Sequence, residues 1–103
     1  MIGDLLSKLQ EARHQIEEAK KKLNDFIVEA SAENGAIKVK ANANKTLISI
    51  VIDEHLIQAD NKVQLEELIT VVVNRALEDA ALKGELEMKR ITQGMLPNFP
   101  GLI

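Results

Sequence analysis

Few side chains in this sequence have the chemistry for acid–base catalysis or metal binding. His55 follows Asp53 and Glu54 in the stretch DEHL, where one imidazole and two carboxylates could together hold a metal ion. Three such residues at the end of a strand more often form a turn that caps the next helix, and we favour that interpretation. His14 falls on the outer face of a predicted helix, which is typical of a solvated side chain.

The sequence also lacks the motifs of the common catalytic sites. It contains no nucleophile elbow, P-loop, dinucleotide fingerprint or zinc-ligand spacing, and no cysteine. We therefore predict that the protein is not an enzyme and has no catalytic residue, no metal ligand, no cofactor and no small-molecule substrate. A metal-dependent enzyme built around DEHL is a minor alternative, which a metal assay on the purified protein would test.

Length and charge restrict the classes of partner. The 103 residues fit one domain, 1–103, which is small enough that a partner chain would help to cover its core. Hydrophobic residues make up 46% and charged residues 28%, as in a globular protein. The formal net charge of −3 offers no general attraction to nucleic acid or to an anionic membrane. Any binding to nucleic acid must therefore come from local basic patches.

The N-terminal stretch MIGDLLSKLQ does not have the pattern of a signal peptide, because Asp4 and Lys8 interrupt its apolar residues. No apolar run approaches the roughly 20 residues that cross a bilayer. The absence of cysteine suits a reducing compartment. We expect a protein of the cytoplasm that has no membrane partner.

Residues 1–25 are predicted to form a helical arm. Their apolar and small residues are spaced alternately by three and four, the heptad pattern of a helix that packs along another helix. An intramolecular partner helix and an intermolecular one are about equally compatible with this pattern. The positions of the seam are Ile2, Leu5, Leu9, Ala12, Ile16, Ala19, Leu23 and Phe26.

Residues 26–53 are predicted to form a three-stranded antiparallel sheet, with strands at about 26–33, 36–42 and 46–53. Asn34-Gly35 lies between two β-branched runs and indicates a hairpin, because both residues tolerate positive φ. The second strand alternates apolar residues with Lys38 and Lys40, so one face should be buried and the other wet. The third strand, LISIVI, is apolar on nearly both faces and needs cover or a partner chain.

A long helix is predicted over 62–91, followed by an extended tail over 92–103. Asp60 or Asn61 is placed to cap the helix, and its apolar stripe suits the cover of a sheet. Gly84 is a weak point beyond which the stripe thins, and Gly94 indicates the stop of the helix. The fold class is therefore α+β, with the element order α-β-β-β-α.

Three segments resemble one family closely. GAIKVKANANKTLISIVIDEHL, LEELITVVVNRALEDA and MKRITQGMLPNFPGL are similar to the YbaB/EbfC family of bacterial nucleoid-associated proteins, and the resemblance covers nearly the full chain. The positions that carry it are Gly35, Val39, the strand end Ile50 to Asp53, Leu65, Leu68, Asn74, Ala76, Gly94, Leu96 and Pro97.

The resemblance implies a tweezer-like homodimer that binds double-stranded DNA with low sequence specificity at the nucleoid. The family commonly has a glycine in the second turn of the sheet, where this chain has Asn42-Ala43-Asn44-Lys45. We expect an asparagine to take the positive φ there, because asparagine tolerates it next best. The first 25 residues also differ from the more basic family pattern, since they carry five basic and five acidic residues.

Eight basic residues are predicted to contact DNA phosphates. The alternatives are a solvated face for the lysine triplet and complementation of the helix dipole for Lys83, Lys89 and Arg90. Lys38 and Lys40 are a further pair, for which protection of a sheet edge is the better interpretation. Since no aromatic residues lie between the basic ones, we expect contacts to the duplex backbone and a steep dependence on salt. The eight residues are Lys8, Arg13, Lys20, Lys21, Lys22, Lys83, Lys89 and Arg90.

The surface that joins two subunits is predicted to come from the third strand, the long helix and the tail. An interaction scaffold that binds another protein or a second dimer, with little or no DNA binding, is the alternative function; the acidic balance and the apolar C-terminus favour it. The predicted packing residues are Leu47, Ile48, Ile50, Leu65, Ile69, Val72, Met95, Leu96 and Phe99.

Overall fold

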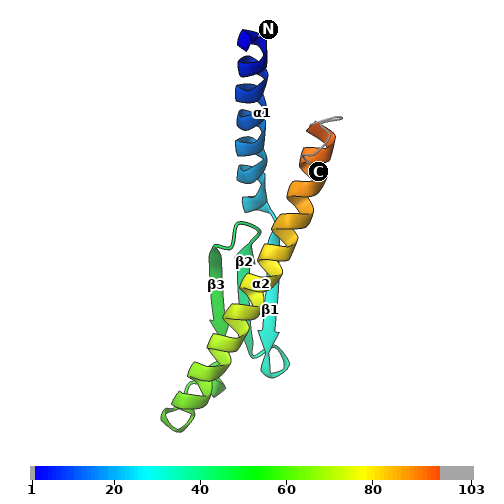
Figure 1. Ribbon diagram of the computed structural model, residues 1–103. Coiled ribbons are helices and arrows are strands. Elements are labelled where there is room, and N and C mark those ends of the chain that lie inside the picture. The colour runs from blue at the N-terminus through cyan, green and yellow to red at the C-terminus, as the bar shows by residue number, and fades with distance from the viewer. Residues whose placement is uncertain (1, 96–103) are drawn as a thin grey trace.

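The predicted order of elements is confirmed by the computed structural model, which describes residues 2–95 (Figure 1). The chain is elongated, with Cα extents of 70 × 18 × 18 Å. One helix precedes a three-stranded sheet and a long helix follows it. The elements are α1 (Ile2–Lys22), β1 (Ile27–Ala32), β2 (Ile37–Asn42), β3 (Leu47–Ile52) and α2 (Lys62–Met95).

Helix α1 packs against the rest of the chain only near its C-terminal end. Ala19 is fully buried, and Leu23, in the 3₁₀ turn that follows the helix, is buried as well. Every described side chain from Ile2 to Glu11 is exposed, including the leucines of the predicted seam. Figure 1 accordingly shows α1 projecting well beyond the sheet. The seam is therefore used intramolecularly over its second half and left open over its first half.

The sheet is antiparallel with the order β1-β2-β3, so β2 is its central strand. The predicted alternation is present in β2, where Ile37, Val39 and Ala41 are buried while Lys38 and Lys40 are exposed. The interpretation of these lysines as edge protection is wrong, because both neighbours of β2 are hydrogen-bonded strands. The register instead places Lys40 directly opposite a carboxylate, that of Glu29, an arrangement that stabilises a sheet.

Both turns of the sheet use positive φ. In the first turn Glu33, Asn34 and Gly35 have φ of 53°, 57° and 89°, which agrees with the Asn-Gly prediction and extends it by one residue. In the second turn the residue with positive φ is Lys45, at 63°, and the expectation of an asparagine there is wrong. Asn42 stabilises this turn through its side chain, whose oxygen accepts hydrogen bonds from the backbone N–H groups of Asn44 and Thr46.

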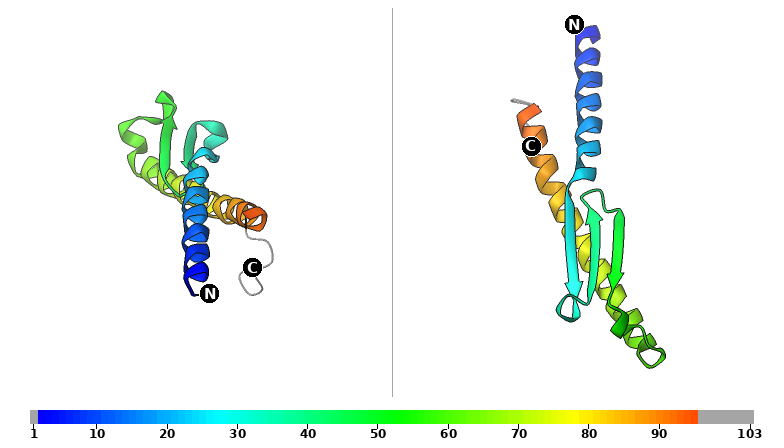
Figure 2. Two further views of the ribbon diagram at one scale, coloured as in Figure 1. Left: turned by 90° about the horizontal axis from the view of Figure 1, so that it is seen from above. Right: turned by 180° about the vertical axis from the view of Figure 1, so that it is seen from behind.

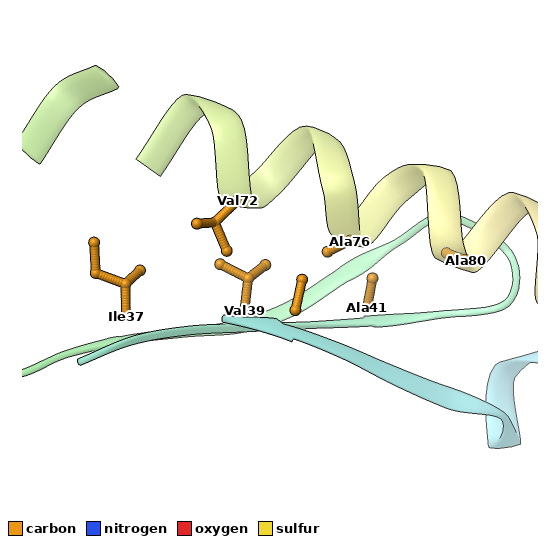
Figure 3. Close-up of a cluster of buried hydrophobic side chains, with 7 residues drawn as sticks. Ile37, Val39, Ala41, Val72, Ala76 and Ala80 are labelled. Atoms are coloured by element: carbon orange, nitrogen blue, oxygen red, sulfur yellow. The ribbon is translucent and has the colours of Figure 1, made fainter. Parts of the chain in front are cut away.

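The core lies between α2 and one face of the sheet. Figure 3 shows Val72, Ala76 and Ala80 of α2 directed toward β2, where the buried side chains of its inner face meet them. The alanines allow the helix to approach the sheet closely. Among the described residues, the largest fully buried side chains are Ile37, Val39 and Val72. Complete burial of one such side chain contributes about 1.5–3 kcal/mol. Because most other buried residues are alanines, the apolar core contributes little stability for a chain of 103 residues.

Helix α2 crosses the sheet diagonally and packs on β1 and β2, leaving β3 at an open edge (Figures 1 and 2). Ile50 pairs with the buried Val39 yet remains 43% exposed, and Ile48 and Val51 are exposed as well. The third strand is therefore apolar but left largely exposed, so the predicted cover is not supplied by the described part of its own chain.

Gly84 has a packing role. A Cβ atom at this position would lie 2.5 Å from the carbonyl oxygen of Ala43, in the turn between β2 and β3. The absence of a side chain therefore lets α2 pass close to that turn. Although the apolar stripe of α2 thins beyond Gly84, the next turn is still packed, since Glu87 is buried there.

Both predicted signals for the ends of α2 need correction. The helix continues to Met95, four residues past the expected end, and contains Gly94, because one glycine within a helix costs only about 1 kcal/mol. At its start, a 3₁₀ turn, Ala59–Asn61, leads into the helix. Within the described part of the chain, the side chains of Asp60 and Asn61 make no capping hydrogen bond.

Candidate nucleic-acid interface

The two helices that carry the predicted DNA-contacting residues leave the sheet at the same end of the molecule. Figure 2 shows α1 and the last turns of α2 diverging from their base in both views. Lys20 of α1 and Lys83 of α2 are about 60 residues apart in the sequence, yet they lie on helices that contact each other. Lys38 and Lys40 lie apart from them, on the open face of the sheet.

The basic side chains of α1 are exposed but do not form one patch. A helix turns by about 100° per residue, so Lys20, Lys21 and Lys22 together span about 200° of its circumference. Arg13 and Lys20 are two turns apart and share one flank of the apolar seam. Lys8 and Lys22 share the other flank, while Lys21 points away from the seam and pairs with Glu18 at 3.2 Å. The predicted set therefore divides into two flanks and one outer position.

Two of the three predicted DNA-contacting residues of α2 pair with one buried carboxylate. Glu87 is only 3% exposed, and its Oε1 atom lies 3.2 Å from Lys83 Nζ and 3.7 Å from Arg90 Nη1. Lys89 is exposed and has no ion pair within residues 2–95. The alternative role of Lys89 and Arg90 at the helix dipole loses support, because α2 extends to Met95 and its last turn contains no basic residue.

Lys83 also contacts the segment that joins α1 to the sheet. Its Nζ atom lies 5.4 Å from the centroid of the Phe26 ring, within the range of a cation–π interaction. The lysine is consequently held between an aromatic ring and a buried anion, and its side chain is 40% exposed. Phe26, the last position of the predicted seam, thus packs beside a cation of α2.

A network of side-chain amides fixes the base of α1 to the sheet. Asn44 Nδ2 donates to the carbonyl oxygen of Lys20 at 2.9 Å and to Asn24 Oδ1 at 2.7 Å. Asn42 Nδ2 donates to the same Asn24 oxygen at 3.3 Å. Hydrogen bonds therefore attach the turn between β2 and β3 to the C-terminal end of the arm. This attachment fixes the orientation of the helix segment that carries Lys20, Lys21 and Lys22.

The residues considered for metal or acid–base chemistry do not converge. His55 Nδ1 lies 3.8 Å from Asp53 Oδ2, and both side chains are largely exposed. Between residues 2 and 95, no group of three or more His, Cys, Asp or Glu side chains is placed to hold a metal ion. His14 is exposed, in agreement with its predicted position on the outer face of α1. No helix within this range is long and apolar enough to cross a membrane.

The predicted packing residues fall into three groups. Leu47, Ile48 and Ile50 are exposed on the edge strand β3 and are free to meet another chain. Leu65 and Ile69 are half-buried, whereas Val72 is fully buried within its own chain. The remaining three are Met95, which is the last described residue, and Leu96 and Phe99, which lie outside the described residues.

Two features were missed from the sequence, although each leaves a trace there. Glu87 continues the buried stripe of Ala76, Ala80 and Gly84 with spacings of four, four and three, so the sequence places it on the same face of the helix as these residues. Lys83 and Arg90 lie four residues before and three residues after it, the spacings of helical ion pairs. The amide network is harder to predict from the sequence, because no local pattern indicates that Asn24 and Asn44 are in contact.

The fold and the charged end of the molecule define a class of small helix–sheet–helix proteins. A model of the YbaB/EbfC DNA-binding family matches residues 1–95, and the chain belongs to this family.

The relatives agree along nearly the whole chain. A "Nucleoid-associated protein" of Flavobacterium johnsoniae is 31% identical over 98 residues, which cover 95% of this chain and 91% of that protein. "Nucleoid-associated protein Teth39_2199" of Thermoanaerobacter pseudethanolicus is 35% identical over 101 residues, covering 98% and 89%. The crystal structure of uncharacterized protein HP0035 from Helicobacter pylori superposes with a TM-score of 0.61 at 23% identity and 92% coverage of both chains, which supports the fold.

Proposed function

We propose that the chain is a homodimeric nucleoid-associated protein that binds duplex DNA with low sequence specificity. Basic residues of α1 and of the C-terminal half of α2 make the contacts, and the bacterial nucleoid in the cytoplasm is the site of action. One observation carries this proposal: the two helices that hold the predicted DNA-contacting residues leave the sheet at the same end of the molecule and diverge there (Figure 2). The family and the names of the relatives point in the same direction.

The character of the side chains favours contacts with the DNA backbone. The basic groups of α1 stand on long, exposed side chains, and none of them is fixed in a geometry that would read base edges. Lysine and arginine side chains of this kind neutralise phosphates and release counterions, which gives binding that varies little with sequence and falls steeply with salt. Because the net charge is −3, affinity depends on how these few cations are placed.

The shape of one chain supports a dimer. Its Cα radius of gyration is 19.6 Å, whereas a compact domain of this length has about 13 Å. The edge strand β3 is apolar on both faces, and such an edge is a template for pairing with another chain. A second copy that covers β3 would also bring a second pair of basic helices. We expect size-exclusion chromatography with light scattering to give twice the chain mass of 11.4 kDa.

A titration of fluorescent duplex DNA at several salt concentrations tests the proposal. In one variant Lys20, Lys21 and Lys22 are replaced by alanine, and in the control Lys38, Lys40 and Lys62 are replaced instead. Both variants lose three positive charges, but the control residues lie on the open face of the sheet and at the start of α2. The slope of log K against log salt should flatten in the first variant by about 0.9 for each phosphate that is no longer neutralised, and stay unchanged in the control. Equal slopes in all three proteins would refute the assignment to α1.

A protein-interaction scaffold is the second candidate, and the open half of the α1 seam favours it. Ile2, Leu5, Leu6 and Leu9 are all more than half exposed on one helix, and patches of this kind mark binding surfaces. The absence of binding to long duplex DNA at low salt, together with a tetramer or a co-purified protein, would select this function.

A further inference from the structure

The ion cluster on α2 places two of the eight proposed DNA-contacting cations against the same anion. Lys83 and Arg90 both pair with Oε1 of Glu87, at 3.2 Å and 3.7 Å. Glu87 is 3% exposed, so its charge is shielded little by solvent and salt and acts strongly on both neighbours. A DNA phosphate must compete with this carboxylate for each of the two cations.

The third cation of this half of α2 provides an internal comparison. Lys89 stands next to Arg90 and is exposed, and it has no ion pair within the described part of the chain. Lys89 and Arg90 therefore carry the same charge at nearly the same place, but only Arg90 has an anionic partner. A difference between them in DNA binding would report the effect of Glu87 rather than the effect of net charge.

We propose that Glu87 limits the affinity of this protein for duplex DNA by holding Lys83 and Arg90 in ion pairs. This inference rests on the proposed function and adds a residue that sets its strength. Glu87 is a positioning residue: it touches no DNA, and of the three proposed DNA-contacting cations of α2 it leaves only Lys89 free for phosphates. Arg90, whose side chain is 73% exposed, can turn toward DNA if the carboxylate releases it, while Lys83 is also held over Phe26.

A purely structural role for Glu87 predicts a different pattern. In that case the carboxylate would only anchor α2 beside the base of α1, and its loss would lower stability without changing how many phosphates the protein neutralises. The salt slope separates the two roles, because it counts the counterions that binding releases and does not depend on the stability of a protein that remains folded.

The main test compares Glu87→Gln with Glu85→Gln. Glutamine retains the shape of Glu87 and one acceptor oxygen but carries no charge. Glu85 is an exposed residue of the same helix without an ion pair in residues 2–95. Both substitutions remove one negative charge, so a general electrostatic effect appears equally in both. We expect Glu87→Gln to bind the duplex several-fold more tightly than Glu85→Gln at low salt. The slope of log K against log salt should be steeper for Glu87→Gln by up to about 1.8 for each copy of α2 that contacts DNA. This difference corresponds to two further neutralised phosphates.

Alanine substitutions in the otherwise unchanged protein test the same inference without altering Glu87. Lys89→Ala should weaken binding more than Lys83→Ala or Arg90→Ala, although each removes one positive charge. In the Glu87→Gln background the loss for Arg90→Ala should approach that for Lys89→Ala, whereas Lys83, which stays over Phe26, should contribute less. Equal losses in the unchanged protein, or equal slopes for Glu87→Gln and Glu85→Gln in folded proteins that bind DNA, would overturn the inference. If no variant binds duplex DNA at low salt, the proposed function itself fails.

Discussion

The side-chain nitrogen of Asn44 lies 2.7 Å from the side-chain oxygen of Asn24, twenty residues earlier in the chain. The same Asn24 oxygen also accepts a hydrogen bond from Asn42, so two residues of the turn between β2 and β3 meet at one atom of the α1 base. The base of the arm is thus linked to this turn through the Asn24 oxygen and, by a second bond of Asn44, through the carbonyl oxygen of Lys20.

Replacing Asn24 with alanine should weaken the attachment of α1 to the β2–β3 turn and lower the stability of the protein. The change leaves the Nδ2 donor of Asn42, which is part-buried, without its acceptor and removes one of two acceptors from Asn44. Loss of such bonds costs about 1–2 kcal/mol, and each kcal/mol corresponds to a fall in melting temperature of about 4–8 °C for a domain of this size. Thermal denaturation followed by circular dichroism measures the effect.

Asn74→Ala is the matched control for this prediction. Asn74 is exposed on α2, and within residues 2–95 its side chain makes no hydrogen bond. Alanine also favours a helix more than asparagine does, so this variant should melt at or slightly above the temperature of the unchanged protein. Similar melting temperatures for both variants would show that the amide network contributes nothing to stability.

Gly84→Ala should destabilise the protein although alanine is the better helix former. The gain in helix propensity is about 1 kcal/mol, but the new methyl group would meet the Ala43 carbonyl oxygen at 2.5 Å. That turn cannot easily yield, because Ala43 donates its backbone N–H to the carbonyl oxygen of Phe26 at 2.9 Å. Overpacking of this kind costs about 1–3 kcal/mol, so we expect a net loss of stability in urea denaturation.

Gly3→Ala provides the comparison for Gly84→Ala. Gly3 is also helical, and no atom lies within 4 Å of the place its Cβ would occupy. The substitution should leave stability unchanged or raise it by no more than about 1 kcal/mol. A Gly84→Ala protein that gains as much stability as Gly3→Ala would contradict the close approach of α2 to the β2–β3 turn.

Local patterns were sufficient to predict the fold because each element has a strong period of its own. The alternation from Ile37 to Ala41 and the Asn34-Gly35 turn depend on residues close together in the sequence, and both are present in the structure. The errors arose where a distant contact decides the outcome. Lys45 takes the positive φ of the second turn because Asn42 and Asn44 are engaged in hydrogen bonds, two of which reach back to Asn24.

The candidate site was predictable as a set of residues but not as an arrangement. The basic residues of α1 and α2 could be identified from their type, while their placement at one end follows from the tertiary arrangement, in which α2 crosses the sheet and extends past it at the end where α1 projects. The pairing state of Lys83 and Arg90 depends on the burial of Glu87, which only tertiary packing determines. A prediction from residue type alone therefore overestimated how many of the basic side chains of α2 are free to contact DNA phosphates.

Ile48→Lys should weaken the proposed dimer. Ile48 is 50% exposed on the open edge strand, where a second chain would bury it, and burial of an unpaired lysine is costly. We expect the dissociation constant of the dimer to rise by at least about tenfold, the equivalent of 1.4 kcal/mol, in analytical ultracentrifugation.

Leu82→Lys separates this effect from a general effect of added charge. Leu82 is 62% exposed on α2, about half a turn away from the buried Ala80, and it is not among the proposed packing residues. Its replacement should leave the dimer intact. If both variants dissociate equally, or neither does, β3 is not the joining surface.

Truncation after Met95 tests whether the apolar tail takes part in assembly. The removed residues, 96–103, contain four large apolar side chains and no charged one, and two prolines restrict their unfolded conformations. Burial of even one such side chain against a partner contributes about 1.5–3 kcal/mol. We therefore expect the truncated protein to melt at a lower temperature and to dissociate at a higher concentration. The double substitution Leu96→Ser with Phe99→Ser should reproduce the loss, while Asn98→Ser should not. A truncated chain with unchanged melting temperature and dimer mass would remove the tail from the packing surface and leave that role to β3 and α2.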